Sequence, residues 1–176
     1  MAKKKDAAPE GNGASDETAA GAADGADTKE AKFGVLAQFI KDLSFESPNA
    51  PASLQEPGEN PRLELNIQVQ AMKHSDEVYE VDLLFETKAQ SESGVIFNIE
   101  LIYAAIFQAK NIPEEHMTRV LHVDAPIIMF PFMRRVVADL TRDGGFQPLM
   151  LDPIDFNGLF RQNADKAIIV DAKSSS

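Results

Sequence analysis

The chain contains no cysteine among its 176 residues. This excludes a disulfide framework and any chemistry that depends on a thiolate. It also lacks any apolar run close to the roughly 18 residues needed to cross a bilayer, so we expect no direct membrane insertion. The opening, Met1 to Lys5, is basic like the start of a signal peptide, but no apolar stretch follows it. These absences predict a soluble, cytoplasmic protein.

Positive charge is also scarce, with 17 Lys and Arg against 28 Asp and Glu and a net charge of −11. Nucleic acid is therefore an unfavourable partner, because its phosphates would be repelled. Residues 1–32 hold 5 Lys and 7 acids, which leaves −9 of the net charge to residues 33–176. The acidic balance favours a basic protein partner, and solubility alone is the alternative that composition leaves open.

Large apolar side chains are missing from the first 32 residues after Met1, which are almost entirely small or charged. Such a segment cannot bury enough surface to fold, so residues 1–32 are predicted to be a disordered tail. Residues 33–163 form one domain by length and composition. Residues 164–176, with one small apolar patch and three terminal serines, are predicted to be a mobile tail.

Four stretches alternate apolar residues at odd positions with polar or acidic residues at even positions. They run from Phe39 to Glu46, Leu63 to Gln70, Tyr79 to Glu86 and Val95 to Tyr103. Because side chains along a strand point to opposite faces in turn, this alternation predicts strands with one apolar and one acidic face. An antiparallel sheet is expected, since buried parallel strands would be apolar on both sides.

After the strands, the polar run Asn111 to His116 predicts the start of a short helix covering Met117 to Val120, and two further helices are expected. Asp124-Ala-Pro126, with Asp124 as the cap, predicts the start of a helix that ends near Asp143, before Gly144-Gly145, with a kink or late start at Pro131. Its apolar residues occupy more than one side, so we expect an oligomer whose helices lie between sheets. Asp155 is predicted to cap a short second helix from Phe156 to about Asp165.

No catalytic motif is evident, and the protein is not expected to be an enzyme or to need a cofactor. His122-Val-Asp124 has the His-x-Asp spacing of some metal sites, so a metal-dependent or small-ligand enzyme using His122 and Asp124 is one alternative. A plain oligomeric scaffold is another. Glu80 and Asp82 lie two apart on one strand face, as a glycosidase pair could. Because nothing apolar is expected to surround these carboxylates and raise a pKa, they are predicted to be exposed on the surface.

Several segments resemble the SecB family of protein-export chaperones. They are Lys41-Asp-Leu-Ser-Phe-Glu-Ser-Pro-Asn-Ala-Pro51, Val78-Tyr-Glu-Val81, Pro126-Ile-Ile-Met-Phe-Pro-Phe132, Gly145-Phe-Gln-Pro-Leu-Met-Leu-Asp-Pro-Ile-Asp-Phe156 and Leu159-Phe160. The resemblance covers about residues 37–163. It implies an α+β fold in which two helices pack on one face of a four-stranded antiparallel sheet. It also implies a homotetramer, a dimer of dimers with helices sandwiched between sheets.

The resemblance further implies that the protein holds unfolded precursor proteins in an apolar groove and delivers them to the SecA ATPase. Asp42, Glu46 and Glu100 match the acids of the family that contact SecA. Phe39, Phe156, Leu159 and Phe160 fall at positions that resemble the client-binding groove. Asn98 departs from the leucine that is frequent at its position in the family.

Overall fold

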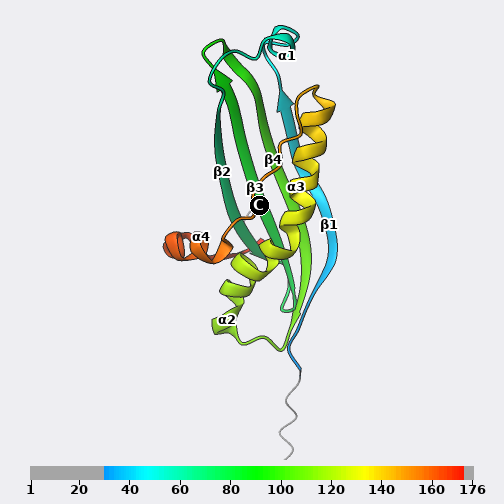
Figure 1. The fold of residues 1–176 in the computed structure, drawn as a ribbon. Helices are drawn as coiled ribbons and strands as arrows, with labels where there is room; N and C mark the ends of the chain where they lie inside the picture. Colours follow the sequence, from blue (N-terminus) through cyan, green and yellow to red (C-terminus); the bar gives the residue numbers. More distant parts are fainter. Residues whose placement is uncertain (1–29, 173–176) are drawn as a thin grey trace, which may run out of the picture.

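A computed structural model describes residues 30–172 of the chain. The predicted disordered tail, residues 1–32, lies outside the described residues except for its last three, and Lys32 begins the first strand. The core is one curved sheet with strand order β1-β4-β3-β2-β5 and a layer of helices against one face (Figure 1). The strands are β1 (Lys32–Glu46), β2 (Arg62–Lys73), β3 (Val78–Ser91), β4 (Gly94–Lys110) and β5 (Ile169–Asp171).

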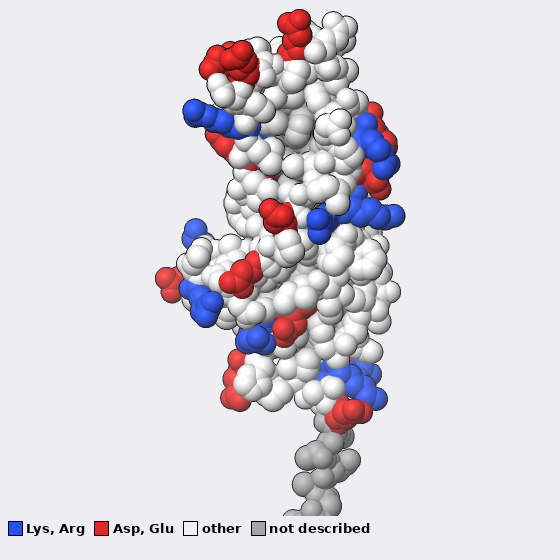
Figure 2. Space-filling view, viewed as in Figure 1, with Lys and Arg blue, Asp and Glu red and all other residues white. Residues whose placement is uncertain are grey.

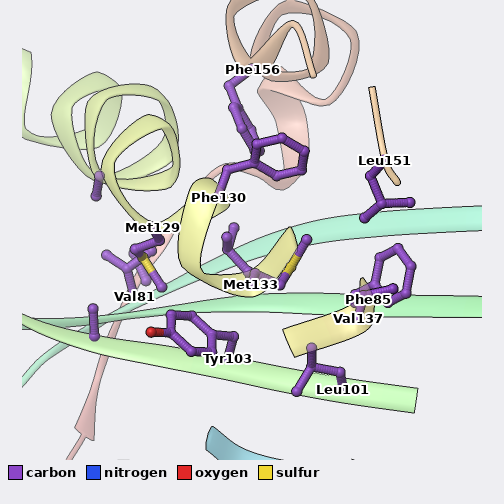
Figure 3. Packing of buried hydrophobic residues seen from close by; sticks show 14 of the residues in the cluster. Val81, Phe85, Leu101, Tyr103, Met129, Phe130, Met133, Val137, Leu151 and Phe156 are labelled. Atoms are coloured by element: carbon purple, nitrogen blue, oxygen red, sulfur yellow. The ribbon is translucent and has the colours of Figure 1, made fainter. Parts of the chain in front are cut away.

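The alternation of the sequence explains which face of the sheet is covered. The odd-numbered side chains of β3 and β4 are buried and include Val81, Leu83, Phe85, Ile99, Leu101 and Phe107. They pack against α3 (Ala125–Asp143), whose Met129, Met133 and Val137 point into the same core (Figure 3). We call this the inner face, and we call the face with the even-numbered side chains of β2 to β4 the outer face.

The four long strands pair antiparallel, as predicted. The predicted sheet of four strands was incomplete, because β5 adds a fifth strand that runs parallel to β2. Only Ala71–Lys73 of β2 pair with it. The three residues of β5 lie within the segment predicted as a mobile tail, and their apolar Ile169 packs against the core. Residues 173–176 lie outside the described part.

The short helix predicted near Met117 is confirmed, but it is not separate from the long helix. α2 (Glu114–Arg119) continues through a π-helical segment, η1 (Val120–Asp124), directly into α3. Asp124 is helical and caps nothing, so the predicted capping role was wrong, and its carboxylate lies 3.3 Å from Arg119 instead. Helix α3 runs through Pro131 without a late start and ends before Gly144-Gly145, as predicted, with Gly145 at φ +88°.

The remaining elements are short. They are α1 (Ala52–Gln55), α4 (Phe156–Gln162) and the 3₁₀ turn η2 (Ala164–Lys166). Asp155 caps α4 as predicted, because its carboxylate accepts a hydrogen bond of 2.9 Å from the Gly158 amide. In the described part of the chain, no helix is long and apolar enough to span a membrane.

Strand β1 departs from the alternation of the other strands. Its pairing with β4 shifts register between Val35 and Ala37 and again between Ile40 and Asp42. Each shift adds a residue and reverses the face on which the following side chains point. Phe39 therefore pairs with Ala104 and lies on the outer face, whereas the odd-number rule predicted the apolar face.

Candidate functional site

The outer face carries the predicted acidic residues. Asp42, Ser44 and Glu46 of β1 pair with Ile102, Glu100 and Asn98 of β4, so all six lie on this face. The three acids Asp42, Glu46 and Glu100 are exposed, as the strand alternation predicted.

The acidic surface also extends beyond the residues selected from the sequence. Glu86 of β3 pairs directly with Glu100 and is exposed. Two glutamates directly opposite one another on neighbouring strands repel each other, so this pair lowers the stability of the sheet. The signal that would have found Glu86 is the same even-numbered alternation. We call Asp42, Glu46, Glu86 and Glu100 the acidic surface.

A second set of charged groups lies at the other end of the outer face. Lys41, in the second irregularity of β1, places Nζ 2.7 Å from Glu80 Oε1 and 2.7 Å from Asp82 Oδ2. His74 Nε2 lies 2.7 Å from Glu80 Oε2. The Asp82 side chain is only 4% exposed, and its Oδ1 has no hydrogen-bond partner among the described residues. We call these four residues the ion cluster.

Burial and pairing compete in the ion cluster. Burial raises the pKa of Asp82, and the neighbouring Glu80 adds to that effect, so the pKa stays above its usual value despite the bond to Lys41. Burial also raises the pKa of Glu80, but hydrogen bonds from Lys41 and His74 outweigh it and the net pKa is lowered. Burial lowers the pKa of Lys41, and its two carboxylate partners more than reverse this.

The expectation that Glu80 and Asp82 are exposed surface carboxylates was wrong. Both are buried, since the Lys41 side chain binds across them. This contact could not be predicted from the sequence, because Lys41 is 39 and 41 residues away and reaches the two carboxylates only through the irregular pairing of β1. The pair is thus part of a structural ion cluster.

The predicted groove residues do not lie together within one protomer. Leu159 and Phe160 of α4 line a pocket of about 400 Å³ together with the stretch of β2 from Asn66 to Gln70. Phe156 is 3% exposed and packs edge-on against Phe130, with ring centroids 5.9 Å apart (Figure 3). Phe39 lies on β1, at the opposite edge of the sheet, because β4, β3 and β2 intervene.

His122 also lines this pocket, although the sequence suggested it only as a metal ligand. Its Nδ1 lies 2.9 Å from the Thr118 carbonyl, and its Nε2 is buried with no partner among the described residues. Asp124 instead pairs with Arg119. In residues 30–172 no group of three or more His, Cys, Asp or Glu side chains could hold a metal ion.

The helix side of the molecule also carries exposed apolar side chains that do not line the pocket. Figure 2 shows this side with wide uncharged areas and charged groups scattered between them. The exposed large apolar residues include Ile127, Ile128 and Phe132 of α3, and Val35, Leu36, Ile40 and Leu43 of β1. Apolar surface of this extent is typical of protein interaction sites.

Comparison with known proteins identifies the family. Residues 26–167 match the family model described as preprotein translocase subunit SecB. The chain is 48% identical to the protein-export protein SecB of Bradyrhizobium sp. over 77% of its length and 83% of the relative's. It is 48% identical to that of Rhodopseudomonas palustris, which it covers to 87%.

A solved structure shares the fold at much lower identity. It is the SecB-like chaperone of Mycobacterium tuberculosis, in complex with a peptide from an antitoxin, with a TM-score of 0.57 and 17% identity. The match covers 69% of this chain and 90% of the other. The long family match, together with the close relatives, leads to one conclusion: the chain belongs to the SecB family, whose members are export chaperones and not enzymes.

Proposed function

We propose that this export chaperone works in the cytoplasm, where it binds unfolded precursor proteins on its apolar surface and delivers them to the SecA ATPase. The observation that supports this most directly is the separation of two surfaces. The pocket of Leu159 and Phe160 lies at α4 and β2, whereas the acidic surface lies on the outer face of β1, β3 and β4. One chaperone can thus hold a client and contact a basic partner at the same time.

Client holding needs no catalysis. An unfolded chain exposes apolar side chains, and burying them gains about 25 cal/mol per Å² without demanding a sequence. Leu159 and Phe160 are half-buried, so they offer such a surface, and Phe156 of the same helix is buried in the core. Phe39 is partly exposed at the other edge of the sheet. In an assembly it extends the client-binding surface along a neighbouring protomer.

SecA delivery uses charge. The exposed carboxylates of Asp42, Glu46 and Glu100 form a negative surface, and a basic segment of SecA is attracted to it. Such attraction mainly raises the rate of encounter and is weakened by salt. SecA then competes for the loaded chaperone and releases the client.

The proposed assembly is a homotetramer, a dimer of dimers, and two separate apolar surfaces support it. The first is Ile127, Ile128 and Phe132 on α3, where Ile127 is 50% exposed although it lies in the first turn of a structured helix. The second is the apolar side chains of the edge strand β1. Several weak client contacts on four copies act together through their high effective concentration.

The test is to dilute an unfolded, slowly folding precursor into buffer with and without the chaperone and to follow its refolding rate, aggregation and complex mass. We expect delayed refolding, less aggregation and a complex that contains four chaperone chains. A Leu159→Asp, Phe160→Asp variant is expected to lose most of this holding. No effect of the chaperone on refolding or aggregation would contradict the proposal.

Delivery is tested separately with Glu100→Lys. We expect this change to weaken SecA binding about tenfold, because it replaces an attraction with a repulsion, while client holding is unchanged. Glu115→Lys is the matched control, since it makes the same charge change on exposed α2. Equal loss of SecA binding in both variants, or loss of holding in Glu100→Lys, would count against a SecA site on the outer face.

A further inference from the structure

The pocket beside α4 contains one polar group that the proposed function leaves unexplained, the ring of His122. The residue is 5% exposed and lies in η1, a π-helical segment. Segments of this kind widen a helix by one residue and are frequent at functional sites. A buried polar atom with no partner is uncommon in folded proteins and calls for a physical explanation.

The proton of the His122 ring can be assigned from its hydrogen bond. Nδ1 lies 2.9 Å from the carbonyl oxygen of Thr118, and a carbonyl only accepts. Nδ1 therefore carries the proton. Burial lowers the pKa of His122, which keeps the ring neutral near pH 7. In this tautomer Nε2 has a free lone pair, so it is an acceptor that needs a donor.

The pocket contains a second incomplete feature, the edge of β2. Strand β5 covers only Ala71–Lys73, so among residues 30–172 the stretch from Arg62 to Gln70 has a strand neighbour on the β3 side alone. The pocket is lined by the part of this edge from Asn66 to Gln70, with Leu159, Phe160 and His122 opposite. Every second residue of an edge strand directs its N–H and C=O outward.

We propose that His122 Nε2 accepts a hydrogen bond from a backbone N–H of an extended client segment that lies between the edge of β2 and α4. This rests on the proposed function and adds a residue that selects the client's backbone. An unfolded chain is the occupant that fits, because it supplies free amide donors together with apolar side chains. The chain's own extended segment, β5, already occupies the next stretch of the same edge.

Access to Nε2 requires a local movement. Its exposed area is below 1 Å², and the Phe160 ring lies 6.2 Å from the His122 ring, centroid to centroid. Phe160 must turn aside when a client enters. A single acceptor for an N–H discriminates weakly among sequences, since every residue except proline carries that donor. It favours extended backbone over folded surface.

The experiment uses the full chain and a fluorescent ten-residue apolar peptide whose single aromatic residue fixes its register. A series of peptides carries one N-methyl group each, which removes one amide donor at a time. One methylation is expected to weaken binding to the wild type about tenfold, in line with the loss of one buried hydrogen bond. The same methylation is expected to have little effect on His122→Leu, which already binds the unmodified peptide more weakly.

The control is His116→Leu, an exposed histidine of α2 outside the pocket, which should behave as the wild type. If every methylation has the same effect on wild type and His122→Leu, the proposal is overturned. A merely structural role for His122, including a ring that only holds a water molecule, would give that result. If the peptide does not bind the wild type at all, the proposed client function itself fails.

A measurement on the wild type keeps the proposal testable should His122→Leu not fold. The ¹⁵N resonance of Nε2 in histidine-labelled protein is expected to move upfield when the peptide is added, because a bare ring nitrogen becomes a hydrogen-bond acceptor. The Nδ1 resonance should stay nearly constant. An Nε2 signal that does not respond to saturating peptide would overturn the proposal.

Discussion

Lys41 is the residue whose role depends most on the folded structure. It binds two buried carboxylates, and removing one partner of a buried charge cluster leaves the others uncompensated. Lys41→Met keeps the length of the side chain without its charge. We expect a loss of about 2 kcal/mol in the free energy of unfolding, below the 3 to 5 kcal/mol of a fully buried pair because the Lys41 side chain is 38% exposed.

Chemical denaturation of Lys41→Met measures this loss. Lys73→Met is the matched control, because Lys73 forms an ion pair with the exposed Asp76 and not with a buried carboxylate, and its midpoint should stay close to the wild-type value. Adding Asp82→Asn to Lys41→Met should recover part of the lost stability, because it removes one of the two neighbouring negative charges that Lys41 neutralises in the wild type. A midpoint for Lys41→Met equal to that of the control would refute the structural role of the ion cluster.

The buried ring of His122 makes the stability of the protein depend on pH. Burial lowers the pKa of His122 in the folded state below the usual histidine value of about 6.5, and the hydrogen bond to Thr118 only partly offsets this. The unfolded chain therefore binds a proton more readily, so the contribution of His122 is present above pH 6.5 and is lost as pH falls through that value toward the folded pKa. Wild-type stability should thus fall more steeply between pH 7 and 5 than that of His122→Leu.

Urea denaturation at several pH values from 7.5 to 5 provides the comparison. Carboxylates also titrate in this range, so the informative quantity is the difference between wild type and His122→Leu. His116→Leu, which removes an exposed histidine from α2, should retain the wild-type slope. Parallel pH profiles for wild type and His122→Leu would mean that the buried ring contributes nothing to the dependence.

Elements with a strict alternation were predictable from the sequence, and β1 shows where that reasoning ends. In β2 and in most of β3 and β4 the side-chain period of two persists along the pairing, so inner and outer residues follow from their numbers. A register shift between Ala89 and Gln90 ends this rule near the β3–β4 turn, where Gln90 pairs with Val95. In β1 two irregularities reverse the faces between them and moved Phe39 to the outer face. An extra residue in a strand is hard to recognise in the sequence, because its effect is on the pairing: it changes which residue of the neighbouring strand lies opposite each residue.

The start of the long helix was missed for a different reason. Asp124-Ala-Pro126 is typical of a helix start, because proline lacks the N–H that a first turn does not use. Here the helix begins before it, and the Ala125 N–H bonds to Val120 five residues back. The π-helical turn accommodates a proline that an ordinary helix interior would tolerate poorly. The same turn contains His122. Neither the boundary of the helix nor the place of His122 in the pocket could therefore be predicted from the sequence.

Helix α4 gives a test at the scale of one element. It has seven residues, too few to be stable alone, and its first turn is held by the Asp155 carboxylate on the Gly158 amide. Asp155→Ala should destabilise α4 by about 1 kcal/mol, the usual value of such a cap. Because α4 carries Leu159 and Phe160, client binding should weaken with it while the sheet stays intact.

Hydrogen exchange of the α4 amides is the measurement, with the central amides of β3 and β4 as an internal reference. Exchange in α4 should accelerate about fivefold, as about 1 kcal/mol implies, and the reference should not change. Asp152→Ala is the control, since Asp152 is exposed in the preceding loop and makes no cap. Faster exchange across the whole protein would show that the change acts on global stability.

In the proposed tetramer, the exposed apolar side chains are the surfaces on which copies meet. The exposed side chains of α3 and those of β1 come from different elements, and α3 packs on β3 and β4. Two distinct self-complementary surfaces are what a dimer of dimers requires, because each twofold axis needs its own contact. Disruption of one surface should then leave dimers held by the other.

Phe132→Asp tests this division. Phe132 is 45% exposed on α3 and is not part of the buried core. Placing a carboxylate at a contact that pairs with its own copy introduces a desolvated charge on both sides, so we expect that contact to open. Light scattering should give about twice the 19.2 kDa chain mass where the wild type gives four times that mass.

Met150→Asp is the matched control, because Met150 is exposed in the loop before α4 and belongs to neither surface. Its mass should equal that of the wild type. The dimers of Phe132→Asp should still hold a short client, since each pocket lies within one protomer, but should hold a long precursor more weakly as fewer linked sites remain. A wild-type chain that runs as a monomer, or a Phe132→Asp variant that remains a tetramer, would refute an interface through α3.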